Sequence, residues 1–356
     1  MQKAINRNFD CRIMDDIIYK GMHTIFLENE FIRVGILLDK GADIFQFLDK
    51  KNDIDFLWRS PNGLVDTRQY RETISNSSGS FLDLYHGGWQ EIFPGGGPVN
   101  YRGADLGLHG EVTHLGWNYE IITDTESEIA IRLSVDCIRT PFRLEKILRV
   151  IQNKPTLFIE EEITNLSPES QDFMWGHHPA FGAPFLRGGL KILTPAGKAQ
   201  VHSPKFSESG IFEPGMEFDW PIINFNSEIK DLSKTSGPED GFCDLIYLKE
   251  LKAGWFALMD EQRKVGFGLA WPVDIFPFLW FWMVYGKAPG YPWWDRAYCV
   301  ALEPWTSIPN NLNQAIQNGK SANLKGGGSL AASLCATVIY DKKSIKEIKP
   351  DGTVIN

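Results

Sequence analysis

The sequence lacks the features that identify several large classes of protein. It contains only five Cys residues, and no two of them form a Cys-x-x-Cys pair. Neither a disulfide framework nor a zinc ribbon is therefore indicated, and a reducing cytoplasm is the simplest compartment. The first residues contain no apolar segment typical of a secretory signal. The longest aromatic and aliphatic run, 278–285, is far shorter than the ~20 residues that span a bilayer, so no membrane partner is expected.

Positive charge is also scarce, with 36 Lys and Arg against 45 Asp and Glu and a net charge of -9. Proteins that bind the phosphate backbone present a basic face, so no nucleic-acid partner is expected. The only Gly-Lys-Ser, at 319–321, has Gln314 where a P-loop needs glycine. His109 and His114 are five residues apart, whereas a zincin helix places its two His four apart. We therefore predict no metal and no cofactor.

Aromatic side chains are abundant instead. They make up 13% of the chain, which includes 12 Trp. Some of these rings belong in the core. A surplus of Trp also suits stacking against flat apolar ligand faces, such as those of sugar rings.

Alternation of apolar and polar residues predicts an all-β fold. Strands are expected at 31–38, 129–135, 156–163, 191–193, 255–259, 265–271 and 332–340. No run of 12 or more residues has helical periodicity with caps. Many short strands separated by turn signals indicate one large sandwich or barrel domain over 21–356, preceded by an N-terminal extension over 1–20. Two stretches, 59–83 and 203–241, are predicted to be long loops, which often carry function.

Four segments contain residues suited to chemistry, at 85–98, 107–111, 175–182 and 300–307. Glu303 lies inside an apolar strand and next to Pro304 and Trp305. A carboxylate in such surroundings is expected to be partly buried, and buried charges are paired or functional. His177 and His178 are adjacent, so only one of them can face a given pocket from a strand.

Together these segments resemble the aldose 1-epimerase, or galactose mutarotase-like, family. The resemblance extends from about Phe26 to the C-terminus, and the matching elements are Leu108-His109-Gly110, His178-Pro179-Ala180-Phe181, Asp244 within 243–248, Leu302-Glu303-Pro304 and the turn at 324–329. The resemblance implies a galactose mutarotase-like β-supersandwich with a sugar on its concave face. It also implies an isomerase that interconverts the α and β anomers of a hexose or related sugar.

The resemblance also implies roles for four residues. Glu303 is the expected base, His178 the expected acid, and His109 lies beside the ring oxygen and the anomeric centre. Asp244 is expected to accept hydrogen bonds from sugar hydroxyls. Opposed environments would hold Glu303 ionised and His178 protonated at the same time.

Well-known members of the family carry an Asn-Arg-Ile element before the first His. In this sequence the segment 89–94 stands in its place. Arg102 or Arg71 is expected to substitute for that Arg, or Gln90 and Glu91 to make its contacts. Further candidates for the pocket are His86, Glu111, Trp175 and Trp305, with Trp89 and Trp117 as alternative stacking rings. His114 and His177 are expected to point away from the pocket, and His23 and His202 to lie on the surface.

Two other functions remain open at this point. The first is a carbohydrate-binding protein without turnover on the same scaffold, and the second is an isomerase, epimerase or lyase of a modified sugar. An aldose 1-epimerase is favoured over these alternatives by the presence of His109, His178 and Glu303, because binding alone does not require an acid and a base. No cluster of Arg or Lys lies near the motifs, which favours a neutral sugar as the partner of a monomer or homodimer.

Overall fold

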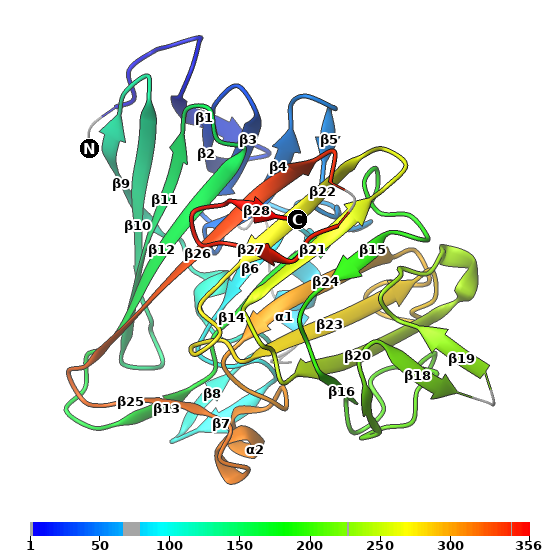
Figure 1. Ribbon diagram of the computed structural model, residues 1–356. Helices are drawn as coiled ribbons and strands as arrows, with labels where there is room; N and C mark the ends of the chain where they lie inside the picture. Colours follow the sequence, from blue (N-terminus) through cyan, green and yellow to red (C-terminus); the bar gives the residue numbers. More distant parts are fainter. Residues whose placement is uncertain (1–2, 67–78, 226–227, 343) are drawn as a thin grey trace.

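Strands dominate the computed structural model, which describes residues 3–66, 79–225, 228–342 and 344–356 (Figure 1). Two large antiparallel sheets hold most of them, so the predicted all-β fold is confirmed. The helices of the described residues are all short: α1 (Gly79–Leu84), α2 (Leu312–Gln317), η1 (Val112–His114) and η2 (Pro238–Asp240).

The first sheet has 12 strands. In spatial order its strands are β1 (Arg12–Tyr19), β2 (Met22–Glu28), β3 (Ile32–Leu37), β4 (Asp43–Asp49), β6 (Trp89–Ile92), β14 (Gly176–Phe181), β24 (Tyr298–Trp305), β23 (Phe278–Tyr285), β20 (Phe242–Lys249), β16 (Lys198–Val201) and β17 (Glu217–Asp219), with β5 (Ile54–Asp55) paired to β4.

The second sheet has 8 strands, in the order β15 (Lys191–Leu193), β21 (Trp255–Asp260), β22 (Val265–Ala270), β26 (Ser329–Tyr340), β12 (Thr156–Asn165), β11 (Phe142–Ile151), β10 (Glu128–Asp136) and β9 (Asn118–Asp124). Separate two-stranded ribbons are β7 (Val99–Tyr101) with β8 (Ala104–Leu106), β13 (Gln171–Phe173) with β25 (Ala322–Leu324), β18 (Ile222–Phe225) with β19 (Glu228–Asp231), and β27 (Glu347–Ile348) with β28 (Val354–Ile355).

All seven segments predicted to be strands lie in strands of the two sheets. The predicted loop at 203–241 is only partly a loop, because it contains β17, β18 and β19, which are too short to show alternation. In the other predicted loop, residues 67–78 lie outside the described residues and α1 begins at Gly79. Within the predicted extension, residues 12–19 form β1, which pairs with β2 at the edge of the large sheet.

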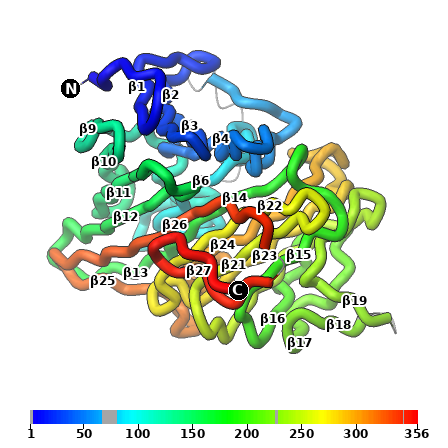
Figure 2. The backbone as a smooth tube through the Cα atoms, turned by 45° about the horizontal axis from the view of Figure 1, so that its top comes forward, coloured from blue at the N-terminus to red at the C-terminus, as the bar shows by residue number. Residues whose placement is uncertain are grey.

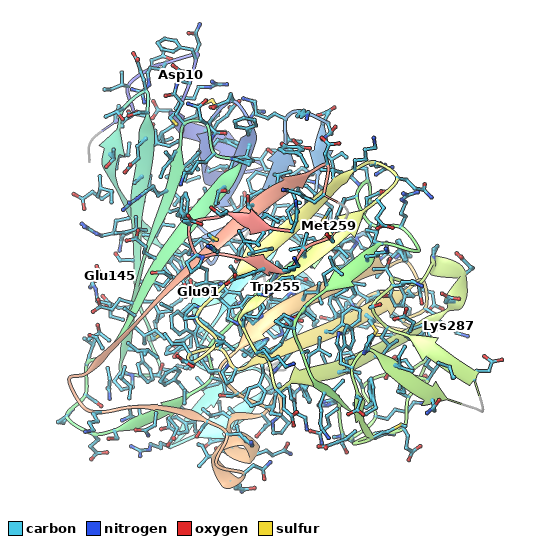
Figure 3. The ribbon with its side chains drawn as sticks, viewed as in Figure 1. Asp10, Glu91, Glu145, Trp255, Met259 and Lys287 are labelled. Carbon is cyan, nitrogen blue, oxygen red and sulfur yellow. The ribbon has the colours of Figure 1, made fainter. Side chains whose placement is uncertain are left out.

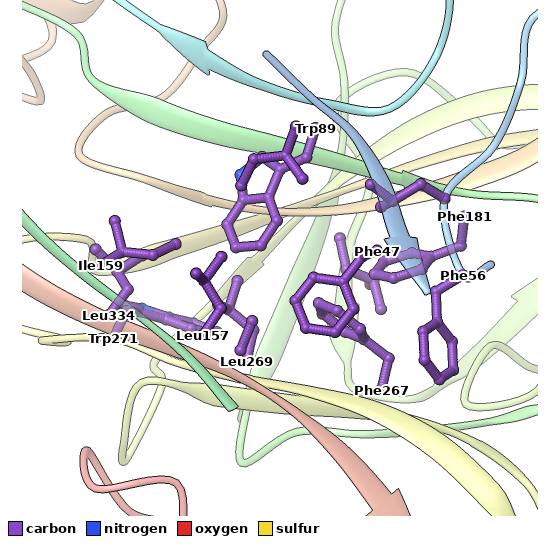
Figure 4. Close-up of a cluster of buried hydrophobic side chains, with 14 of the residues drawn as sticks. Phe47, Phe56, Trp89, Leu157, Ile159, Phe181, Phe267, Leu269, Trp271 and Leu334 are labelled. Atoms are coloured by element: carbon purple, nitrogen blue, oxygen red, sulfur yellow. The ribbon is translucent and has the colours of Figure 1, made fainter. Parts of the chain in front are cut away.

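The main core lies between the two sheets. Figure 4 shows Phe47, Trp89 and Phe181 of the large sheet packed toward Leu157 and Phe267 of the small one. The rings of Phe47 and Phe181 have their centroids 5.2 and 5.0 Å from that of Phe267. Burial of such apolar area, at ~25 cal/mol per Å², holds the sheets face to face. On the outer side of the small sheet, β27 lies against β21 and β22 (Figure 2).

Four ionisable side chains are buried inside this core. Lys146 Nζ is 3.0 Å from Glu91 Oε2, and His177 Nε2 is 3.0 Å from Glu161 Oε2. Figure 3 shows Glu91 among the inner strands, whereas Glu145 lies at the outer side of the molecule. Buried ionisable groups are tolerated when they have a partner, and each of these four side chains has one inside the core.

A second apolar cluster covers the opposite face of the large sheet. It contains five of the 12 Trp residues, namely Trp58, Trp280, Trp282, Trp293 and Trp305. Trp305 packs against Gly176, because a Cβ atom at Gly176 would lie 2.2 Å from Cδ2 of the indole ring. Part of the Trp surplus is therefore concentrated on one face of one sheet.

Gly176→Ala is expected to force Trp305 away from the sheet. The added methyl group should lower the free energy of unfolding by ~1–3 kcal/mol, which is the usual cost of overpacking. Urea denaturation of this variant measures the effect. Gly95→Ala is the matched control, because no atom lies closer than 4.0 Å to a Cβ at Gly95. Equal destabilisation by both substitutions would contradict the close packing of Trp305 on Gly176.

Candidate active site

A cavity of about 320 Å³ opens on the Trp-rich face of the large sheet. The polar side chains at its inner end are Tyr85, His109, His178 and Glu303, beside the rings of Phe81, Trp280 and Trp282. Side chains nearer the mouth are Leu82, Phe206, Ser207, Pro289 and Tyr291. The cavity therefore brings together the three residues predicted to be catalytic.

The strand register aligns the floor of this cavity. His178 of β14 lies opposite Gln90 of β6, and Trp280 of β23 lies opposite Glu303 of β24. The pairs Gly176–Trp305 and Ala180–Ala301 place His178 opposite Glu303 as well. Residues directly opposite each other in an antiparallel sheet share a face. A single row across four strands thus carries Gln90, His178, Glu303 and Trp280.

Glu303 and His178 form an acid–base pair in the cavity. His178 Nε2 lies 3.5 Å from Glu303 Oε1, and Trp305 Nε1 donates a hydrogen bond to Glu303 Oε2 at 3.0 Å. Burial raises the pKa of Glu303 to about 8, although the Trp305 hydrogen bond opposes that rise. Burial also lowers the pKa of His178 to about 4. Both shifts favour the neutral forms, which is the reverse of the ionised pair expected from the sequence.

Tyr85 lies on the far side of His178. Its hydroxyl is 3.4 Å from His178 Nδ1, and its side chain is 2% exposed. Between about pH 4 and about pH 8, His178 Nε2 and Glu303 Oε1 together hold one proton that can dissociate. The Tyr85 hydroxyl can donate to His178 Nδ1 or accept from it, according to which ring nitrogen carries the hydrogen. Tyr85 is therefore placed to influence the tautomer of His178.

His109 completes the inner end of the cavity from a turn rather than a strand. Its φ of 65° is unusual for a residue other than glycine, and its backbone N–H donates to Gly96 O at 2.6 Å. The imidazole stacks on Phe81 at 4.2 Å between centroids and lies 5.3 Å from the ring of His178. Burial lowers its pKa well below the ordinary value. A neutral imidazole there offers one donor and one acceptor to a ligand.

Three residues predicted to bind substrate do not line the cavity. Trp175 is two residues from His177 and faces the same side of the sheet, so it lies in the core between the sheets. Its Nε1 donates to Glu91 Oε1 at 3.1 Å. Asp244 faces away from the cavity, since its neighbours Cys243 and Leu245 line it. Gln90 shares the floor row but donates to Gly87 O at 2.6 Å and is fully buried.

Three other predicted contacts are also absent from the lining of the cavity. Arg102 lies on the exposed turn between β7 and β8, where it pairs with Glu169 at 3.2 Å. His86 is buried behind the floor, with Nδ1 3.9 Å from Asp43 Oδ2. Trp305 stacks on Trp280 at 4.0 Å and acts on the site through its hydrogen bond to Glu303. None of the six side chains predicted to bind substrate therefore lines the cavity.

The remaining sequence predictions have mixed outcomes. Glu91 lies in the core with Lys146, and Glu111 accepts hydrogen bonds from the backbone of 138–140, so neither acid lines this cavity. His177 is structural, as predicted. His114 also lies outside the lining, although it belongs to η1 and not to a strand. His202 was expected on the surface but is 7% exposed and contacts Tyr247 Oη at 2.5 Å.

Three further outcomes concern Trp89, Trp117 and Arg71. Both Trp residues belong to the core between the sheets and do not line the cavity. Arg71 lies outside the described residues. His23 is exposed, as predicted.

Sequence reasoning missed Tyr85, Phe81, Trp280 and Trp282 as individual site residues. Trp280 and Trp282 are two residues apart in β23, so both point to the same face, and that spacing was visible in the sequence. Phe81 and Tyr85 are four residues apart in and after α1, and their rings stack at 5.0 Å. A helix of this length gives too few residues for a periodic signal.

No arrangement of three or more His, Cys, Asp or Glu suited to a metal ion occurs among residues 3–66, 79–225, 228–342 and 344–356. Within the same residues, no helix has the length and apolar character needed to cross a membrane.

Tyr85→Phe should change the tautomer balance of His178. The variant keeps the ring contacts but removes the hydroxyl that contacts Nδ1, so the ¹⁵N chemical shifts of His178 should change. Selective histidine labelling and NMR measure those shifts. Tyr101→Phe is the control, because the Tyr101 hydroxyl is buried but donates to Gln171 away from the cavity. Unchanged His178 shifts in Tyr85→Phe would contradict the contact.

Comparison with family models places nearly the whole chain in one family. Residues 19–338 match the model of DUF4432, a domain of unknown function. No curated protein matches the sequence significantly.

Several solved structures share the fold at low sequence identity. A Klebsiella pneumoniae protein assigned provisionally as an aldose 1-epimerase superposes with a TM-score of 0.73 at 17% identity, covering 93% of this chain and 83% of that one. A galactose mutarotase-like protein from Clostridium acetobutylicum gives 0.61 at 14% identity, covering 93% and 99%. A galactose mutarotase related enzyme from Lactobacillus acidophilus gives 0.59 at 18% identity, covering 91% and 100%.

These similarities agree with the resemblance found in the sequence. The chain has the galactose mutarotase-like fold and belongs to the DUF4432 family.

Proposed function

We propose that this protein is an aldose 1-epimerase, which interconverts the α and β anomers of a neutral hexose or a related sugar. The observation that supports this most strongly is the Glu303–His178 pair, whose Oε1 and Nε2 atoms lie 3.5 Å apart at the inner end of the cavity. A general acid and a general base side by side are what ring opening of a sugar requires.

The proposed reaction balances as two proton transfers. The Glu303 carboxylate takes the proton of the anomeric hydroxyl while the C1–O5 bond breaks and C1=O1 forms. The His178 imidazolium gives its Nε2 proton to O5. The open aldehyde turns about C1–C2, and the same two transfers run backward to close the other anomer. His109, beside the two reacting oxygens, serves as a hydrogen-bond partner, and the chemistry requires no cofactor.

The buried environment suits the intermediate of this reaction. While the sugar is open, Glu303 is protonated and His178 is neutral, and those are the forms that burial favours here. The ring-closed complex needs the charged forms, so hydrogen bonds from sugar hydroxyls must support Glu303 as a carboxylate. Since the charged pair and the neutral pair hold the same number of protons, no proton has to leave the cavity.

The walls of the cavity support a neutral sugar. Trp280 and Trp282 offer flat apolar faces at the inner end. None of the lining residues in the described part of the chain is Lys or Arg, which favours a neutral sugar over a phosphate or a carboxylate.

Exchange NMR on freshly dissolved anomers tests the function. Wild type should accelerate interconversion of at least one sugar from a panel of neutral aldoses. Glu303→Gln and His178→Ala should each lower kcat by ~10²–10⁴-fold with little change in sugar binding. Glu162→Gln, on an exposed position of β12, is the control. Saturable binding without acceleration would favour the carbohydrate-binding alternative, and loss of binding together with kcat in Glu303→Gln would contradict its role as base.

The pH profile of the same rate follows from the two pKa values. Below about 4 both groups are protonated and no base is left, whereas above about 8 Glu303 is ionised while His178 is neutral and no acid is left. The rate should therefore be highest between these limits and fall on both sides. A rate that keeps rising above pH ~9 would contradict the proposal that Glu303 and His178 act while they hold one proton between them.

A further inference from the structure

The cavity changes in character between its inner end and its mouth. Tyr85, Glu303 and Trp280 at the inner end are at most 5% exposed. Phe206 and Tyr291 line the same cavity but are 38% and 51% exposed. Aromatic rings left in water forgo the free energy of burial, and such rings at the edge of a cavity are typical of a binding surface. The two rings therefore form an aromatic rim.

Polar contacts hold the rim in place. Phe206 lies in the loop between β16 and β17, and Tyr291 in the loop between β23 and β24. Ser209 Oγ donates to Lys287 O at 2.8 Å, which ties the two loops together. The Tyr291 hydroxyl donates to Asp83 Oδ1 at 2.8 Å. These hydrogen bonds restrain the two loops that carry the rings, which reduces the entropy lost on binding.

Asp244 gives the loop of Phe206 a second anchor. Its Oδ2 accepts hydrogen bonds from the backbone N–H groups of Ile211 at 2.7 Å and Phe212 at 3.2 Å. Asp244 is 1% exposed, so its carboxylate binds this loop and does not contact a ligand. The side chain expected to contact the sugar instead positions a wall of the cavity mouth.

We propose that the aromatic rim, formed by Phe206 and Tyr291, is a second subsite that holds the outer ring of a reducing disaccharide. This inference rests on the proposed function, because it places the reducing end at Glu303 and His178. C1 and C4 lie at opposite ends of a pyranose ring. A ring whose C1 and O5 reach the inner pair therefore directs its C4 side toward the mouth.

A second sugar joined through O4 of the inner ring reaches the aromatic rim. Sugar rings present flat faces of C–H groups, which pack on aromatic rings as apolar surface does. The lining residues in the described ranges include no Lys or Arg, which favours an uncharged outer ring over a phosphate group. The preferred substrate class is therefore a neutral disaccharide, or the reducing end of a longer chain, in preference to the free monosaccharide.

Paired sugars test the second subsite. The rate of anomer interconversion is measured for α-glucose against α-maltose and α-cellobiose, and for α-galactose against an O4-linked galactobiose. Wild type should show a kcat/KM at least about tenfold higher for one disaccharide than for its monosaccharide. Phe206→Ala and Tyr291→Ala should each remove most of that advantage and leave the monosaccharide rate within about twofold.

Two control variants separate the rings from other effects. Tyr291→Phe keeps the ring but loses the hydrogen bond to Asp83, so it should retain most of the advantage. Trp294→Ala removes a ring of the same loop that is 62% exposed but does not line the cavity, and it should change neither rate. Equal losses on both sugars in Phe206→Ala and Tyr291→Ala, or no preference for any disaccharide in wild type, would overturn the inference.

A binding measurement separates failure of this inference from failure of the proposed function. Glu303→Gln is titrated with the same sugars and followed by NMR, which requires no turnover. Tighter binding of a disaccharide that depends on Phe206 and Tyr291 supports the subsite even if wild type accelerates no anomer. Acceleration of monosaccharides alone, with no effect of the rim variants, leaves the proposed function standing and overturns the second subsite.

Discussion

The hydrogen bond from Trp305 Nε1 to Glu303 Oε2 is the contact on which the site depends. It fixes one oxygen of a fully buried carboxyl and leaves the other toward His178 Nε2. Trp305 in turn stacks on Trp280 and rests on Gly176, where only a glycine leaves room for the indole ring. The geometry of the acid–base pair is therefore set by close packing across three neighbouring strands, and not by a flexible loop.

The large sheet supports two separate groups of charges on its two faces. Residues at alternate positions of β6 and β14 face either the cavity or the core, so Gln90 and His178 lie on one side and Glu91 and His177 on the other. The core groups lie beside partners of their own, although burial still raises the pKa of Glu91. In the cavity, the Trp305 hydrogen bond opposes the effect of burial on Glu303 without cancelling it, so both pKa values of the pair shift toward the neutral forms.

Much of this arrangement could be predicted from the sequence. Alternation located the strands, and the motifs around His109, His178 and Glu303 located residues that are far apart in the chain but line one cavity. Two of the errors could have been avoided by applying alternation evenly. The parity that places His177 away from the site also places Trp175 away from it, and the parity of Cys243 and Leu245 excludes Asp244 from the lining.

Other features were beyond the sequence for a physical reason. The contact of Tyr85 with His178 and the aromatic rim at Phe206 and Tyr291 join loops and a short helix to distant strands, and no periodic pattern records such contacts. Likewise, the pKa of Glu303 depends on how completely the folded chain removes water from it, which an apolar flank only suggests.

The most direct test of the account is a crystal structure of the Glu303→Gln variant with a bound reducing sugar. In that structure the anomeric oxygen should lie within hydrogen-bond distance of the residue 303 side chain, and O5 within hydrogen-bond distance of His178 Nε2. A sugar bound with its reducing end toward Phe206 and Tyr291, and with C1 remote from His178, would contradict it.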